Sequence, residues 1–336
     1  MTLIILWWIL VEKLWYNGNN NQNLKVFIEG EFFMIKDQIA DQLVYSTVRI
    51  VCRDKTTLSR GTGFFMRQHF PDKTNINAIV TNNHVVDSTS SNSYYELSKA
   101  TSIKIKLNSD TYGDDATYDG IDENGMPDDK NHVTITINDL QKRRISHPDK
   151  NIDVCLLFVN DKIEEYEKAG KSVYYKAVGT EMTLLPTDYD SLTSIEDVIM
   201  IGYPNGIMDT YNNKPVVRKG ITATSLKLDY NGTPDFMVDI ACFYGSSGSP
   251  VFLRKEGLAK ETTDKGLTIG LSPSYSLLGI IHSMSIAKAS GEIVVKEIPT
   301  SMKPIVETTI PLNLGQVTKA KKILEIFDLV KARHIK

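Results

Sequence analysis

The fold of this chain is decided by the stretch Gly245-Ser246-Ser247-Gly248-Ser249-Pro250. It lies between two apolar runs, at residues 236–240 and 251–253, that are typical of strands. Glycine adopts positive φ readily, so a turn of this composition can bring its backbone close to a ligand and expose one hydroxyl group. Successive N–H groups in such a turn can converge on an anion. The same residues would also suit a plain hairpin loop.

Composition indicates an ordinary globular protein. Of the 336 residues, 41% are hydrophobic and 24% are charged, which is usual for a globular protein. The length of the chain is enough for one two-lobed domain or two small ones. The formal net charge of −3 gives no reason to expect nucleic acid or an anionic membrane as a partner.

Cysteine usage indicates a reducing compartment. The chain has three cysteines, Cys52, Cys155 and Cys242, and each lies in an apolar run. A buried free thiol is the usual state for such residues. We therefore expect no disulfide framework and a cytoplasmic location.

The first 33 residues need a separate interpretation. Residues 3–11 are strongly apolar but too few to span a bilayer, which takes about 20 residues. They also lack the basic start and the small-residue cleavage site of a signal peptide. The codons of residues 29–31 (EGE) can form a purine-rich ribosome-binding sequence at a suitable distance before the codon of Met34. Our hypothesis is therefore that Met34 is the true start and that residues 1–33 are a translated leader. The competing interpretation is a short membrane-associating helix.

Beyond residue 44, short strand-like segments recur and predict an all-β fold. They are residues 44–52, 61–66, 78–81, 103–107, 133–137, 154–159, 198–202, 216–223, 236–242, 250–253 and 277–282. The acidic stretch from Asp110 to Asp129 fails the spacing of a calcium loop and is expected to be a solvated hairpin. Residues 317–332 carry apolar side chains at helical spacing, which predicts an amphipathic C-terminal helix.

One of the six histidines and one nearby carboxylate have a context that suggests chemistry. His84 ends the segment Thr81-Asn82-Asn83-His84, which follows a short apolar strand. Asp153 leads directly into the apolar run at residues 154–159, and a carboxylate there is costly unless it is paired. Asp149 is the competitor for the same role, but it follows Pro148 in a turn-like sequence.

These three segments, in the order His84, Asp153, Ser247, resemble the chymotrypsin-like serine proteases. Residues 81–86 (TNNHVV) are similar to the histidine segment of bacterial high-temperature-requirement proteases, and residues 247–252 (SGSPVF) to the serine turn of glutamyl endopeptidases. Residues 202–206 (GYPNG) resemble bacterial intracellular trypsin-like peptidase domains, where they lie near the substrate cleft; a simple turn is the alternative.

The resemblance covers residues 44–285 and implies two antiparallel six-stranded β-barrels with a C-terminal α-helix. The peptidase domain would span residues 34–315, with the first barrel at about 44–160 and the second at about 180–300. Residues 160–174 would connect the two barrels, and residues 316–336 would form the helix.

The resemblance also implies the chemical roles. Ser247 would be the nucleophile, His84 its base and Asp153 the group that orients His84. The N–H groups of Gly245 and Ser247 would form the oxyanion hole. Ser246 stands where digestive proteases carry an aspartate that pairs with a new N-terminus, so activation by N-terminal cleavage is not expected.

The substrate pocket would involve Ala241 and His282. By resemblance, Ala241 lies at the floor of the primary specificity pocket, where a preference for lysine or arginine would need a carboxylate. Glutamyl endopeptidases bind glutamate with a histidine near the position of His282, but His282 is one residue out of register, and such a slip reverses the face of a strand. A small or apolar side chain is therefore expected, with glutamate as the alternative.

The sequence thus predicts a serine endopeptidase that acts on a peptide or protein substrate and needs no metal or cofactor. The alternative is a non-catalytic or partner-activated module for peptide binding or sensing on the same fold. The oligomeric state is not predicted by any of these patterns.

Overall fold

The computed structural model describes residues 38–53, 58–70, 75–86, 100–108, 132–137, 140–168, 172–173, 175–209, 213–263, 266–292 and 305–334. The predictions for residues 1–33 and for the acidic stretch 110–129 lie outside these ranges. No helix in the described ranges is long and apolar enough to cross a membrane.

Strands make up most of the described chain. They are β1 (Thr47–Arg53), β2 (Leu58–His69), β3 (Asn75–Thr81), β4 (Ala100–Asn108), β5 (His132–Ile137), β6 (Arg144–Ser146), β7 (Cys155–Leu157), β8 (Ser172–Val173), β9 (Val178–Gly179), β10 (Asp197–Gly202), β11 (Val216–Thr222), β12 (Asp235–Asp239), β13 (Pro250–Thr263), β14 (Gly266–Glu292) and β15 (Ile305–Lys319). The α-helices are α2 (Gln38–Leu43), α3 (Asn83–Val86), α4 (Leu140–Arg143), α5 (Asn160–Lys168) and α6 (Lys321–His334).

The second half of the chain forms a closed barrel. Its six strands follow the order β10-β11-β12-β15-β14-β13, and β13 returns to pair with β10. Every pairing in this barrel is antiparallel. One of the two predicted barrels is therefore confirmed.

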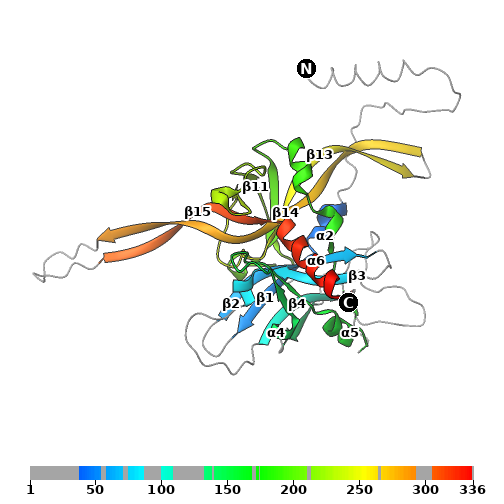
Figure 1. Ribbon diagram of the computed structural model, residues 1–336, viewed down its shortest axis with the longest axis horizontal. Coiled ribbons are helices and arrows are strands. Elements are labelled where there is room, and N and C mark those ends of the chain that lie inside the picture. Colours follow the sequence, from blue (N-terminus) through cyan, green and yellow to red (C-terminus); the bar gives the residue numbers. More distant parts are fainter. Residues whose placement is uncertain are drawn as a thin grey trace, which may run out of the picture.

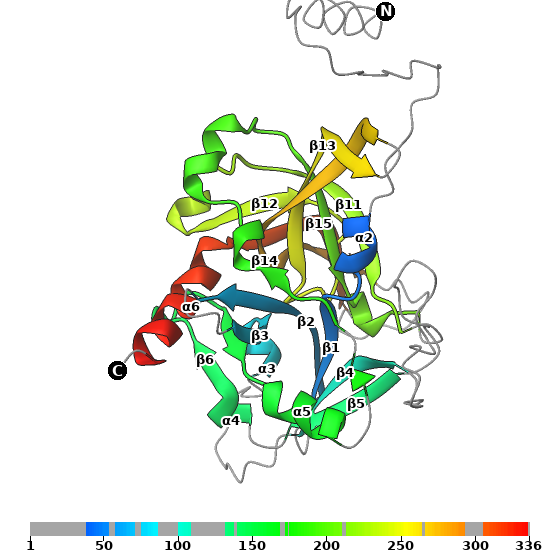
Figure 2. The same cartoon turned by 90° about the vertical axis from the view of Figure 1, so that its right-hand side faces the viewer.

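The first half forms a nine-stranded sheet with the order β5-β4-β1-β2-β3-β7-β6, to which β8 and β9 add at the side. Only the β2–β9 pairing among these is parallel. Figure 2 shows this sheet below the barrel, with α6 at the side of the molecule. The closure of the sheet into a second barrel stays a prediction.

The strands between the two halves are buried on both faces, which explains their continuous apolar sequences. In β10, Val198 points into the closed barrel, whereas the next residue, Ile199, points into a cluster between the halves. In β7, Leu157 packs in the core of the first half and Leu156 joins the same central cluster. Adjacent residues of a strand point to opposite faces, so each strand supplies two cores.

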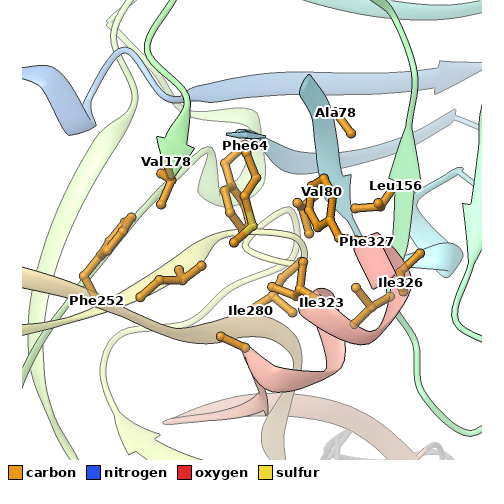
Figure 3. Close-up of a cluster of buried hydrophobic side chains, with 14 of the residues drawn as sticks. Phe64, Ala78, Val80, Leu156, Val178, Phe252, Ile280, Ile323, Ile326 and Phe327 are labelled. Atoms are coloured by element: carbon orange, nitrogen blue, oxygen red, sulfur yellow. The ribbon is translucent and has the colours of Figure 1, made fainter. Parts of the chain in front are cut away.

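Helix α6 completes the central cluster. Figure 3 shows Ile323, Ile326 and Phe327 of α6 beside Phe64 of β2 and side chains of β3, β7 and β14. The predicted C-terminal helix is confirmed. It begins at Lys321 because residues 316–319 complete β15, where Val317 pairs with Phe236.

Two long ribbons extend from the closed barrel in different directions (Figure 1). One consists of the outer parts of β13 and β14, and the other of the outer parts of β14 and β15. The pairing of β13 with β14 ends at Pro250 and Ile280, and Ile281 still bonds to Gly248 and Ser249 of the serine turn. Within the described residues, β14 from His282 onward is paired on one edge only, with β15. This free edge begins next to the serine turn.

Candidate active site

Strand pairing brings His84 and Asp153 together. Strands β3 and β7 are antiparallel neighbours, with Thr81 opposite Cys155. His84 follows β3 and Asp153 precedes β7, so both residues lie at the same end of this strand pair. The ring Nδ1 of His84 contacts Asp153 Oδ2, and the backbone N–H of His84 donates to Asp153 Oδ1 at 3.1 Å. The histidine is therefore held at both its ring and its backbone.

The two asparagines before His84 fasten the same segments. Asn82 Nδ2 donates to the carbonyl of Asp153 at 2.6 Å, and Asn83 Nδ2 donates to the carbonyl of Val154 at 3.2 Å. Asn82 is fully buried, which protects its bond from water. These contacts hold the segment where β3 ends and the short helix α3 begins.

Asp149 serves a local turn. Its Oδ1 accepts a hydrogen bond from the backbone N–H of Asn151 at 2.9 Å, and its own N–H donates to His147 Nδ1 at 3.1 Å. The structure brings Asp153 to His84, and it does not bring Asp149 there.

The serine turn depends on two glycines with positive φ. Gly245 has φ +86° and Gly248 has φ +87°. A Cβ on Gly248 would lie 1.8 Å from the carbonyl oxygen of Thr62, and one on Gly245 would lie 2.8 Å from that of Tyr203. No larger residue fits either position without moving the backbone.

Backbone hydrogen bonds hold the turn between the two halves of the molecule. The N–H of Thr62 donates to the carbonyl of Ser247 at 2.8 Å, and the N–H of Gly248 donates to the carbonyl of Ile281 at 2.8 Å. Ser246 is buried, and its Oγ accepts from the N–H of Phe243 at 3.2 Å. The residue that distinguishes this turn from that of the digestive enzymes therefore stabilises the turn itself.

Ser247 presents its side chain to the cleft. Its Oγ lies 3.5 Å from the carbonyl oxygen of His282 and makes no hydrogen bond to His84. Among the residues that the structure describes, the N–H groups of Gly245 and Ser247 have no acceptor. Two neighbouring donors without a partner suit a developing negative charge on oxygen.

The imidazole of His84 and the hydroxyl of Ser247 face one cleft of about 770 Å³. His84 and Ser247 line it together with Phe243 and Met284. The side chain of His84 is 49% exposed, which leaves its ring accessible from this cleft.

The expected pocket floor lies beside the cleft. Ala241 is partly buried and does not line the cleft, whereas its neighbour Cys242 does. Burial raises the pKa of Cys242 to about 12, against the influence of Arg218. This thiol therefore stays protonated and is a poor nucleophile at neutral pH.

His282 reaches the cleft because β14 is irregular at this position. Ile281 pairs with Val317 and Ser283 with Gln316, so His282 is an extra residue between two regular pairs. Such a bulge turns a side chain to a new direction, which alternation along a regular strand cannot predict. His282 lines the cleft, and its Nε2 lies 3.5 Å from the buried carboxylate of Asp235.

Asp235 is the charged partner behind the cleft. It also accepts hydrogen bonds from Gln316 Nε2 at 2.8 Å and Thr233 Oγ1 at 3.0 Å. Burial by itself would raise the pKa of Asp235, but the contacts with His282 and Gln316 outweigh burial and hold the pKa below its usual value. The carboxylate is therefore ionised at neutral pH.

Several site residues were not expected from the sequence. Thr62 is fully buried, and its Oγ1 both donates to the carbonyl of Gly245 at 3.1 Å and accepts from the N–H of Tyr203 at 3.0 Å. Arg60, which no sequence pattern singled out, lines the cleft, and so does Asn205, as the resemblance of residues 202–206 implied. Within the described residues, no group of three or more His, Cys, Asp or Glu side chains is arranged to hold a metal ion.

Comparison with known proteins identifies the family. Residues 61–258 match the family model described as a trypsin-like peptidase domain. The match covers more than half of the chain, and the chain belongs to this family. The comparison with curated proteins finds no match to this chain.

Among solved structures, the chain is similar to the HtrA-type protease AlgW with a tripeptide, at 14% identity and a TM-score of 0.39, covering 86% of this chain and 61% of that one. It is also similar to tobacco etch virus protease complexed with product, at 9% identity and a TM-score of 0.38, covering 80% and 78%. The serine endoprotease from Yersinia pestis follows at 16% identity and a TM-score of 0.33, covering 71% and 63%. This chain thus spans less than two thirds of the AlgW chain. Similarities of this size identify neither a substrate nor a partner.

Proposed function

We propose that this chain is a serine endopeptidase that cleaves peptide bonds through an acyl-enzyme. One observation carries the proposal: His84, with Asp153 at its ring Nδ1, lines the same cleft as a Ser247 turn whose free N–H groups can bind an oxyanion. Burial raises the pKa of Cys242 to about 12 and keeps that thiol protonated, and we assign the nucleophile to the Ser247 hydroxyl because it lies beside the free N–H groups.

The mechanism follows from these positions. Ser247 Oγ attacks the peptide carbonyl carbon while His84 Nε2 takes the hydroxyl proton. The carbonyl oxygen becomes an oxyanion, which accepts hydrogen bonds from the N–H groups of Gly245 and Ser247. His84 then gives the proton to the leaving amine as the C–N bond breaks. Water, deprotonated by His84, releases the acyl group and restores the Ser247 hydroxyl.

Asp153 has a positioning role in this scheme. Its carboxylate holds His84 with the proton on Nδ1, so that Nε2 is the free base, and it stabilises the imidazolium ion that forms. The second contact, from the backbone N–H of His84 at 3.1 Å, fixes the carboxylate itself.

For the substrate pocket, we propose a preference for a small or apolar side chain next to Ala241 and His282. Cys242, Ile281 and Met284 supply apolar lining. The charge of a protonated His282 would be balanced by Asp235, so the pair offers no net charge to a substrate glutamate. Profiling with a peptide library measures this preference, and enrichment of glutamate before the cleaved bond would contradict it.

The finer architecture and location belong to the same proposal. We expect the nine-stranded sheet to close as a second barrel, as in the chymotrypsin-like proteases that the sequence resembles. The free, buried thiol of Cys242 supports a reducing, cytoplasmic location.

A partner-activated enzyme is the second candidate, and one observation favours it. Ser247 Oγ lies near the carbonyl of His282 and makes no hydrogen bond to His84. In a partner-activated enzyme, binding of the partner would bring the Ser247 hydroxyl to His84, whereas in the simple endopeptidase substrate binding alone would do so.

Hydrolysis of denatured casein tests both candidates. The purified full chain is assayed alone and after addition of cell lysate treated with a serine-protease inhibitor that is then removed, with Ser247→Ala as the matched control. We expect cleavage by the wild type that the Ser247→Ala variant lacks. Cleavage that needs the lysate supports the activated form, and equal product from wild type and variant contradicts both candidates.

A further inference from the structure

The cleft carries a positive charge. Arg60 of β2 lines the cleft and is exposed, and none of the described residues that line it is a carboxylate. His84 and His282 each contact an aspartate behind the cleft wall, whereas Arg60 makes no ion pair within the described residues. The cleft is therefore basic although the chain as a whole has a net charge of −3.

A second arginine supports Arg60. In the β1–β2 pair, Arg49 lies opposite Thr62 and Val51 lies opposite Arg60. Residues directly opposite each other share a face, so the side chains of Arg49 and Arg60 are diagonal neighbours. Both reach Gly206, where a Cβ would lie 3.2 Å from Arg49 Nη2 and 3.4 Å from Arg60 Cδ.

Arg49 is poorly satisfied by the protein itself. Its Nε is buried without a hydrogen-bond partner among the described residues, and its Nη1 donates to the sulfur of Met208 at 3.6 Å. A thioether is a weak acceptor, and two neighbouring guanidinium groups repel each other. A carboxylate bound between them would relieve both costs.

The arginines lie next to the oxyanion turn. A Cβ on Gly245 would lie 3.1 Å from the backbone nitrogen of Asn205 and 3.4 Å from that of Gly206, the glycine that both arginines reach. The serine turn is bonded to β2, the strand of Arg60, through the carbonyl of Ser247 and to β14 through the N–H of Gly248, so the two strands contact the turn at different groups. If the acyl half of a substrate occupies β14 and the pocket, the leaving half extends toward Arg60.

We propose that Arg60, supported by Arg49, forms an anion subsite for the leaving-group half of a peptide substrate. The subsite binds a carboxylate, either of an aspartate or glutamate side chain shortly after the cleaved bond or of a peptide C-terminus. This subsite rests on the proposed endopeptidase function and adds a specificity-determining residue to it.

Binding and cleavage of matched peptides test the subsite separately. The peptides share one small, apolar acyl half and carry Glu, Gln or Lys at each of the first three positions after the expected cleavage site, with amidated C-termini. A further Gln peptide carries a free C-terminal carboxylate. Binding is measured by fluorescence anisotropy with the inert Ser247→Ala chain, and kcat/KM is measured with the wild type.

We expect the Glu peptide to exceed the Gln peptide about three- to tenfold in both measurements, as for a charge-assisted hydrogen bond at a partly exposed site. The preference should shrink in high salt. In the Arg60→Gln background it should vanish, and Arg60→Glu should favour Lys. Arg67→Gln, on the same strand but outside the cleft, is the matched control and should keep the preference.

The outcomes separate the subsite from the proposed function. Equal binding of Glu and Gln peptides, or a Glu preference that survives Arg60→Gln, overturns the subsite. Cleavage of all peptides without a Glu preference also overturns it but leaves the endopeptidase standing. Selective binding without cleavage supports the subsite and contradicts the endopeptidase. A preference confined to the free C-terminus supports the subsite and assigns its ligand to that group.

Discussion

The two halves of the molecule hold their chemical groups by different means. In the first half, side chains do the positioning: Asp153 and Asn82 anchor the segment that carries His84. In the second half, the backbone does it: Gly245 and Gly248 adopt positive φ, and main-chain hydrogen bonds tie the serine turn to its neighbours.

This difference predicts different responses to mutation. A side-chain anchor can be removed one hydrogen bond at a time, so damage should be graded and should affect activity more than folding. In the serine turn, a Cβ added at Gly245 or Gly248 would displace the backbone of the whole turn. Substitutions there should therefore lower the stability of the fold as well as the activity.

Asp153→Asn should have the largest effect. The amide favours the wrong tautomer of His84, in which Nδ1 has lost its proton and Nε2 is no longer the free base. We therefore expect kcat to fall by about 10⁴-fold while the fold persists. Peptide hydrolysis with circular dichroism measures both. Asp149→Asn, the matched control in the nearby turn, should leave kcat within about twofold of the wild type. A similar loss in both variants would contradict the assignment of Asp153.

Gly248→Ala should follow, with a loss of about 3 kcal/mol or more in the free energy of unfolding. The added Cβ would lie 1.8 Å from the Thr62 carbonyl oxygen at a φ of +87°. Gly232→Ala is the control, because Gly232 also has positive φ, +77°, but has no atom within 4 Å of the new Cβ. Urea denaturation should show a loss of only about 1 kcal/mol for Gly232→Ala; equal losses would contradict the steric explanation.

Asn82→Ala should cost about 1–2 kcal/mol of stability and several-fold in kcat/KM, because a buried hydrogen bond to the carbonyl of Asp153 is lost. Asn83→Ala removes two bonds, one of 3.2 Å to the carbonyl of Val154 and one of 2.6 Å from Ser146 Oγ, but neither contacts Asp153, so kcat/KM should fall less than in Asn82→Ala. Kinetics on the two variants rank the anchors of His84, and a larger loss of kcat/KM for Asn83→Ala would reverse the ranking.

The smallest effect concerns pH. The pKa of Asp235 is lower in the folded chain than its ordinary value of 3.8. A lowered pKa contributes stability above the unfolded-state pKa, and this stability is lost as the pH falls through the folded-state value. Asp235→Asn should therefore lower the melting temperature near neutral pH and flatten its decline below pH 3.8. Melts of both proteins between pH 3 and 7 should show curves that converge at the acid end; parallel curves would contradict a role for Asp235.

The parts that follow from local patterns were predicted from the sequence. Three motifs in a fixed order indicated the family, alternating apolar residues indicated the strands, and helical spacing indicated α6. The continuous apolar run at residues 154–159 also indicated a core strand, because β7 is buried on both faces between two cores.

The parts that depend on pairing between distant segments were not predictable. The direction of His282 depends on the bulge opposite residues 316 and 317 of β15, which no local pattern reveals. The long ribbons of β14 depend on pairing with residues 250–263 and 305–319. Arg60 enters the cleft only because β2 passes beneath the serine turn, where Thr62 binds Ser247.

The most direct test of the account is to map the site of a fluorophosphonate adduct by mass spectrometry. The purified full chain is treated with the probe, alone and with inhibitor-treated cell lysate, beside Ser247→Ala and Asp153→Asn. If Ser247 is the nucleophile and Asp153 positions its base, the wild type should carry a single adduct on Ser247. The adduct should be absent from Ser247→Ala and should form far more slowly in Asp153→Asn. Folded wild-type chain that stays unlabelled under both conditions, or an adduct on another residue such as Ser249, would contradict the account.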